Sequence, residues 1–464
     1  MRIAERLTGL LSLGLLALLA MPAAAGVRLV ERPGQTTATR AAVEIDGTVR
    51  THGSGGKTDE HKLVAKARFG FLETRLDKDT AAGKLTDPSQ LKAVRNYLEA
   101  DLQTDVSGHE STVALPDDAR RIVVVGRSEG PIKFSPTALL MRESVDLLDM
   151  PGDPFALVAL LPDPEKEYEA GDTWTPPEWV GQMLCSIDAI AKVDLTCTLK
   201  SIDGGRAVIE VKGRVEGARL GAYSKINLAG VLALDLAQEL IVSASFNYSE
   251  SAEIGTITPG VLSTTSVRLA RQPASQPVDS SDVPLTVPPE ALSLYFDAGP
   301  WGVRMQHGRD WHIYFAQLET DPKVVILRRL DGGNLQCQCN LASIPPAAPG
   351  QHTPVEQFEA DIRRTLGARF GEITSREQYP GTSGVKIFRT DVAGQFAPPA
   401  DGSQPKPINW TYYLIAAPDG RQLSAIFAHE PGASLKLGDE DLEIVRSLEF
   451  FPVGMAKSGT AASR

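Results

Sequence analysis

The sequence predicts an α+β protein of two domains, the first being a β-rich antiparallel domain. That domain is expected to be a curved sheet or half-barrel covered by two or three helices. Residues 192–271 alternate apolar side chains, such as Val193 and Leu195, with polar ones, which is the period of half-buried strands. Within this stretch Asp203–Gly205 marks a hairpin turn, because glycine adopts positive φ at little cost. Prolines and serines then gather in residues 272–290, which separates a second unit from the first.

The first 25 residues have the features of a secretory signal peptide. Arg2 and Arg6 give a positively charged start, and the apolar run Leu7–Ala20 follows them. Ala23–Ala25 then forms a small-residue cleavage site. We therefore expect cleavage after Ala25 and a soluble, periplasmic or secreted protein. The apolar run is shorter than the roughly 20 residues that span a bilayer, which favours a cleaved signal. A retained anchor is the alternative.

The charge balance excludes some classes of partner. The chain carries 47 basic and 58 acidic residues, a formal net charge of −11. Binding to nucleic acid needs a clustered cationic face for the phosphates, and docking on anionic lipid needs basic residues as well. We expect neither nucleic acid nor an anionic membrane surface as a partner.

Strands dominate the expected order of the first domain, residues 26–271. Alternation predicts strands at 27–31, 42–50 and 63–76, and the run Arg121–Val125 predicts a buried strand. Residues 87–106 fit a helix and a strand equally well. Ser135 and Pro136 favour a helix start that runs to Leu148, and a second helix is expected at 177–187. The meander of strands from 192 to 271 follows.

A linker at 272–290 leads to a second domain at 291–452 and a disordered tail at 453–464. The second domain is expected to contain strands on both sides of one clear helix. Thr353 and Glu356 have capping-box spacing, and an apolar stripe through Phe358 and Leu366 runs to the stop at Gly371. The acidic stretch from Asp439 predicts a short closing helix.

The layout of the second domain resembles the Mog1/PsbP-type α-β-α fold over about residues 291–452. The resemblance is carried by the strand Leu335–Leu341, the capped helix, Trp410–Arg421 and Asp441–Phe450. It implies a mostly non-catalytic protein that binds protein partners or helps to assemble complexes. The first half resembles uncharacterised secreted proteins of planctomycete-type bacteria, on three segments: Leu160–Pro164, Gly171–Trp174 and Val211–Gly217.

Four cysteines suit an oxidising compartment, and four allow three pairings. We expect a disulfide between Cys185 and Cys197, which lie a short loop apart. Cys337 and Cys339 point to one face of a strand, where two buried thiols are the simpler interpretation than a metal site.

Three residues of the second domain are candidates for binding a ligand or partner. His307 and His312 flank a predicted hairpin turn, where solvated positions are the simpler interpretation because two imidazoles lack a third metal ligand. Trp311 lies between them and is interpreted either as a core residue or as the lining of a binding groove. No complete catalytic signature accompanies them, so we expect no catalytic residues, no metal and no cofactor.

The sequence therefore favours a non-enzymatic extracytoplasmic binding or assembly protein, expected to be a monomer. One alternative is a carrier of an apolar, lipid-like ligand inside the first domain, with Phe69, Phe71, Val208 and Leu234 around a cavity. The other is a hydrolase whose carboxylates converge only in three dimensions.

Overall fold

The computed structural model describes residues 26–53, 57–76, 85–284, 286–397, 404–433 and 437–453. The expected signal peptide, residues 1–25, lies outside these ranges. So does all of the expected tail except Val453. No helix in the described part of the chain is long and apolar enough to cross a membrane.

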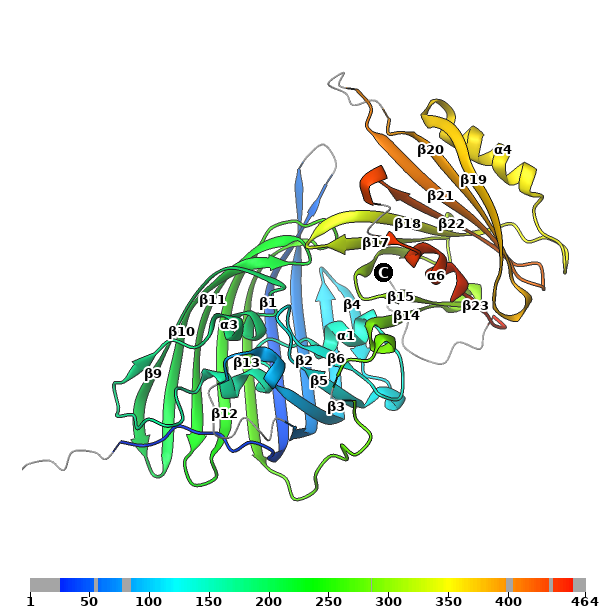
Figure 1. Cartoon of the computed structure of the whole chain (residues 1–464). Coiled ribbons are helices and arrows are strands. Elements are labelled where there is room, and N and C mark those ends of the chain that lie inside the picture. The colour runs from blue at the N-terminus through cyan, green and yellow to red at the C-terminus, as the bar shows by residue number, and fades with distance from the viewer. Residues whose placement is uncertain are drawn as a thin grey trace, which may run out of the picture.

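Twelve strands of the described chain form one antiparallel sheet, which Figure 1 shows as a curved surface of long strands. Its order is β6-β5-β3-β2-β1-β13-β12-β11-β10-β9-β8, with β4 paired to β3. The bounds are β1 Thr36–His52, β2 Thr58–Arg75, β3 Lys92–Val106, β4 His109–Ala114, β5 Arg121–Val125, β6 Ile132–Phe134, β8 Thr173–Trp174, β9 Ala189–Asp203, β10 Arg206–Arg219, β11 Ala222–Asp235, β12 Leu240–Ala252 and β13 Gly260–Pro273. The β-rich, antiparallel part of the fold prediction agrees with this sheet, and the ambiguous stretch 87–106 contains the strand β3.

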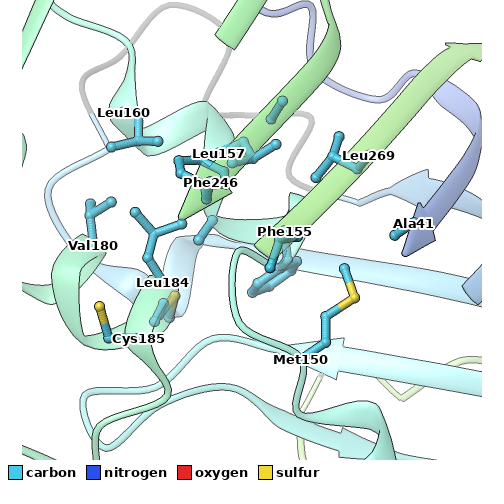
Figure 2. Close-up of a cluster of buried hydrophobic side chains, with 14 of the residues drawn as sticks. Ala41, Met150, Phe155, Leu157, Leu160, Val180, Leu184, Cys185, Phe246 and Leu269 are labelled. Carbon is cyan, nitrogen blue, oxygen red and sulfur yellow. The ribbon is translucent and has the colours of Figure 1, made fainter. Parts of the chain in front are cut away.

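Three short helices lie on the inner face of this sheet: α1 Arg142–Leu148, α2 Pro154–Leu157 and α3 Glu178–Cys185. Phe155 and Leu157 of α2 are almost fully buried and belong to one core with Phe246 and Leu269 of the sheet (Figure 2). Burying such a side chain contributes about 1.5–3 kcal/mol. The predicted helix from Ser135 is shorter than expected, because residues 140–141 pair as a strand instead.

A small four-stranded sheet joins the two halves of the chain. It contains β7 Leu140–Met141, β14 Ser293–Ala298, β15 Val303–Gly308 and β23 Glu449–Phe450, in the order β23-β15-β14-β7. β7 pairs in parallel with β14, through Leu140 opposite Leu294. In the segment predicted as a linker, Val278 and Val283 are buried against Val94 and Val123 of the large sheet.

The remaining strands form a seven-stranded sheet in the order β16-β17-β18-β22-β21-β20-β19. Their bounds are β16 Trp311–Gln317, β17 Val324–Asp331, β18 Asn334–Ile344, β19 Phe370–Pro380, β20 Lys386–Gln395, β21 Pro407–Ala416 and β22 Gln422–His429. The helix α4 Val355–Leu366 covers one face of β20–β22 (Figure 1). The helix is shorter than predicted, because its residues after Leu366 form a 3₁₀ turn and then β19, and its N-terminus has no side-chain cap bond.

The prediction of an α-β-α domain is wrong. The second face of the seven-stranded sheet packs mainly on strands, since Phe296 of β14 and Met305 of β15 share its core. The one α-helix that the described residues place in that layer, α6 Glu440–Arg446, is only seven residues long. The C-terminal half is therefore predominantly β, with one helix on each face of the sheet in the described residues.

Two glycine turns bring the two large sheets into contact. A Cβ on Gly221, between β10 and β11, would lie 2.4 Å from the carbonyl oxygen of Gly333, between β17 and β18. Both glycines have positive φ, +79° and +80°, which side chains rarely adopt. The close approach therefore requires glycine in both turns.

Candidate functional site

A groove of about 640 Å³ crosses the outer face of the twelve-stranded sheet. It spans the five adjacent strands β2, β1, β13, β12 and β11. Neighbouring strands lie about 4.8 Å apart, so the groove is about 19 Å long. That length suits an extended ligand or a segment of a partner better than a compact small molecule.

Two rows of outward side chains form the walls, and the strand register defines both rows. One row consists of Lys66, Glu44, Ser266, Asn247 and Ala229, each opposite the next. The other consists of Val64, Asp46, Thr264, Ser249 and Asn227. The floor is the backbone of the row between them, whose side chains turn to the inner face: Ala65, Ile45, Thr265, Tyr248 and Leu228.

The alternation along β12 explains why this position is hollow. Its inward residues Ala244, Phe246 and Tyr248 are buried, whereas its outward residues are small and uncharged. These outward residues are Ser243, Ser245, Asn247, Ser249 and Ser251. Short side chains leave the backbone accessible between the rows, so the sheet itself forms the base of the groove.

The charges of the groove lie at one end. Glu44, Asp46 and Lys66 belong to β1 and β2, while the end on β11 and β12 carries Asn227 and Asn247. Amide and hydroxyl groups both donate and accept hydrogen bonds. The groove can therefore bind a polar chain along its length and hold a charged group at the β1–β2 end.

A second hollow, of about 800 Å³, lies beside the N-terminal segment. Its lining is Val27, Arg28, Val30, Pro164, Glu165, Leu236 and Glu239. These residues come from loops and turns, which order a ligand less well than paired strands do. We therefore regard the groove as the stronger candidate, although the second hollow is larger.

The inner face holds a buried network of charges. Arg95 on β3 donates to both carboxylate oxygens of Asp153, at 3.0 and 2.5 Å, and to Glu73 at 2.7 Å. Lys133 lies 2.8 Å from the same Asp153. Burial alone would raise the pKa of Asp153, but Arg95 and Lys133 outweigh it and hold that pKa below its ordinary value. The opposite charges compensate one another, and the Arg95–Asp153 pair connects the start of α2 to the sheet.

A second ion pair in the same interior fixes the N-terminal segment. Glu31 accepts two bonds from Arg271, at 2.8 and 3.0 Å, and one from the backbone N–H of Ile241 at 3.0 Å. Arg75 lies 3.6 Å away. Burial alone would raise the pKa of Glu31. The charges of Arg271 and Arg75 lower it by more than burial raises it, so the net shift is downward. This carboxylate joins the start of the domain to its last strand.

The sequence-predicted candidate Trp311 lies in the core of the C-terminal half. It is 1% exposed, packs edge-on against Phe427 and donates from Nε1 to Glu440 at 2.9 Å. Glu440 also pairs with Arg329. Of the two interpretations, the structure places Trp311 as a core residue, and it lines neither the groove nor the second hollow.

The prediction that His307 and His312 are solvated is wrong, because they are 2% and 9% exposed. Both lie near Arg142, which donates to the carbonyl oxygen of Trp311 at 3.1 Å across the junction of the two halves. Burial lowers the pKa of His307 to about 4 and that of His312 to about 3, and Arg142 adds to both shifts. The two imidazoles are therefore neutral parts of the junction.

All four cysteines are free and buried. The expected bond between Cys185 on α3 and Cys197 on β9 is not formed in this structure. Burial raises the pKa of the Cys197 and Cys337 thiols to about 12, which makes them poor nucleophiles. The described residues contain no group of three or more acidic, histidine or cysteine side chains arranged to hold a metal ion.

The residues expected around an apolar ligand are part of a packed core. Phe69, Phe71 and Leu234 are 3%, 1% and 0% exposed and belong to the cluster that the helices fill. Val208 lies on the opposite, outer face of β10. None of the four lines the groove or the second hollow.

Three carboxylates, Asp146, Asp149 and Asp188, lie close enough to Arg219 to interact with its charge. Asp149 lies 3.8 Å from Arg219 and accepts a bond from Ser186, while Asp188 accepts one from the backbone N–H of Leu220. Asp146 on α1 is exposed, yet desolvation by the surrounding fold raises its pKa to about 6. Asp149 and Asp188 thus have structural partners. Burial raises the pKa of Asp188 as well, so a raised pKa does not single out Asp146.

Comparison with known proteins gives no family assignment. No family model matches the chain, and no curated protein matches it. One similar solved structure is that of PsbP from Synechocystis sp. PCC 6803, at 10% identity and a TM-score of 0.27, over 38% of this chain and 98% of that one. Another is lipovitellin, at 8% identity and a TM-score of 0.30, over 54% of this chain and 27% of that one. A PsbP structure is thus a neighbour, but neither TM-score is high enough to support a fold or a function.

Sequence reasoning missed the groove, although a signal for it was present. Alternation within residues 192–271 predicts strands, but alternation treats the outward serines and asparagine of β12 only as the polar half of the pattern. Their small size and lack of charge distinguish them from the lysines, arginines and acids on the outer faces of β2 and β10. The register that lines up five strands is set by tertiary pairing and cannot be read from one segment.

Proposed function

We propose that this protein is a non-enzymatic, extracytoplasmic binding or assembly protein that holds its ligand or partner on the outer face of the twelve-stranded sheet. The observation that carries the proposal is the groove between the rows of Asn247 and Ser249. It offers amides and hydroxyls along its length and ionic side chains at one end. The expected signal peptide supports the extracytoplasmic location.

The rigidity of the groove supports binding rather than chemistry. Its five strands are paired throughout, and a packed core lies beneath them, so the walls keep their spacing without a ligand. A preformed surface loses little conformational entropy on association. The groove therefore favours recognition of an extended polar segment.

The experiment is affinity capture from the cell envelope with the mature chain, followed by mass spectrometry of proteins and small molecules. Thr264→Arg places a long cation in the middle of the groove. Thr196→Arg makes the same change on the outer face of β9, away from the groove. A ligand or partner retained by the wild type and Thr196→Arg but lost with Thr264→Arg supports the proposal. Capture that is equal for all three proteins rejects it.

A further inference from the structure

One edge of the seven-stranded sheet presents an apolar patch that the fold covers only in part. Phe315, Ile326, Asn340, Ile426 and Tyr412 form one row across β16, β17, β18, β22 and β21. The helix α4 covers the Tyr412 end, where Phe358 packs edge-on at 6.5 Å between ring centroids. At the other end Phe315 is 44% exposed and its neighbour Tyr314 is 48% exposed. We call Tyr314, Phe315, Val324 and Ile326 the β16 edge patch.

The strand β16 is also an unpaired edge. It pairs only with β17 in the described part of the chain. The carbonyl oxygen of Trp311, at its start, accepts from Arg142, so the segment Phe315–Gln317 is the part of this edge that lacks a strand partner. Natural proteins protect such edges with charged residues, proline or bulges. The sequence Trp311–Gln317 contains no charged residue and no proline. It has a bulge between Ile313 and Phe315, which leaves Tyr314 out of the ladder, and the Arg328 guanidinium lies 3.5 Å from the centroid of the Tyr314 ring.

The opposite edge of the same sheet shows the contrast. The strand β19 carries Glu372, Arg376 and Glu377, and it contains two bulges. Charges of this kind prevent edge-to-edge pairing, because a second strand would have to desolvate them. The protection is thus present on β19 and largely missing on β16.

We propose that β16 is the site at which a second copy of this chain pairs, antiparallel and edge to edge, around a twofold axis. A strand without charges can meet its own copy without placing like charges together. That condition matters because each copy carries a net charge of −11, which repels the copies elsewhere on their surfaces. Phe315 and Tyr314 of each copy then cover the β16 edge patch of the other. The pairing does not depend on the proposed function, and it replaces the expectation of a monomer.

The size of the patch sets the strength of the dimer. One short edge strand and a few apolar side chains bury less than the roughly 1,200 Å² found in standard stable interfaces. The bulge shortens the ladder further, to Phe315–Gln317. The dimer is therefore weak and depends on protein concentration.

The test is analytical ultracentrifugation of the mature full chain from about 1 to 100 µM, a range that spans weak affinities. We expect a reversible monomer–dimer equilibrium. Phe315→Lys should raise the dissociation constant of the dimer at least about tenfold, because it places a charge in the contact at the twofold axis. The control Gln378→Lys makes the same kind of change on the exposed β19 edge and should leave the equilibrium unchanged. A chain that stays monomeric throughout, or a dimer that Phe315→Lys does not weaken, overturns the proposal.

Cysteine cross-linking provides a second measurement if Phe315→Lys does not fold. The three single variants Tyr314→Cys, Phe315→Cys and Ala316→Cys are each oxidised. Thr374→Cys on β19 is the control. The four native cysteines are buried and contribute little background. A disulfide-linked dimer from at least one β16 position, and none from Thr374→Cys, supports the pairing. No cross-link on β16, or equal cross-linking on both edges, overturns it.

Discussion

Arg95 and Asp153 form a two-bond ion pair inside the N-terminal half, with Nη1–Oδ2 and Nη2–Oδ1 distances of 3.0 and 2.5 Å. Their side chains are 1% and 6% exposed. Because Asp153 caps α2 through the backbone N–H of Phe155, the pair connects the covering helices to β3. This connection holds the helix α2 against the inner face of the sheet.

Asp153→Asn should therefore destabilise the protein by about 3–5 kcal/mol, because Arg95 and Lys133 lose the negative charge that compensates their burial. The measurement is the free energy of unfolding in urea. The surface variant Asp117→Asn, whose side chain is 92% exposed beside Arg120, serves as the control and should change stability little. Equal stability of the two variants would show that the buried pair is not important.

Glu31→Ala should leave a vacant anion site between Arg271, Arg75 and the backbone N–H of Ile241. We expect a lower melting temperature that added sodium acetate partly restores, because acetate binds only the folded state. Sodium chloride at equal ionic strength should not restore it. Glu239→Ala, which removes an exposed partner of Arg32, should show no acetate effect. Absence of any acetate-specific recovery in Glu31→Ala contradicts the account of this site.

Acid should destabilise the protein through His307 and His312. Below a pH of about 6.5 the unfolded chain binds protons at these histidines, while the folded protein resists protonation until the pH reaches about 4 for His307 and about 3 for His312. Unfolding free energy should therefore fall as the pH drops through this range, by about 3 kcal/mol for His307 if its shift is fully expressed. His307→Leu should flatten the pH dependence, whereas His109→Leu, at an exposed position, should not.

Asp146 should have the opposite pH dependence. Its pKa in the folded protein is raised to about 6, so the folded protein binds more protons than the unfolded chain between about pH 4 and pH 6. Stability linked to Asp146 is lost as the pH rises through this window. Asp146→Asn should stabilise the protein at pH 8 and have no effect at pH 4, as measured by unfolding. A carboxyl pKa near 4 for Asp146 by NMR would contradict this.

The strands were more predictable than the layers they form. Alternation located β9–β13 well, because each strand buries one face and exposes the other, as Leu195 and Thr196 do. The same reasoning could not decide residues 87–106, where apolar residues fit two periods. Pairing with β2 and β5 decides that segment in favour of a strand.

The errors in the C-terminal half came from tertiary packing. The Mog1/PsbP resemblance implied helices on both faces, but β14 and β15 occupy most of one face. His307 and His312 looked like exposed hairpin residues, and packing against the N-terminal half buries them. Contacts between segments more than 150 residues apart, such as Arg142 with Trp311, leave no local pattern in the sequence.

The most direct test of the binding account compares Thr264→Arg with Thr196→Arg in affinity capture from the cell envelope. The groove predicts that the wild-type chain and Thr196→Arg retain the same ligand or partner, and that Thr264→Arg loses at least about nine-tenths of it, as a loss of 1.4 kcal/mol would require. Full retention by a folded Thr264→Arg protein would contradict a role for the groove.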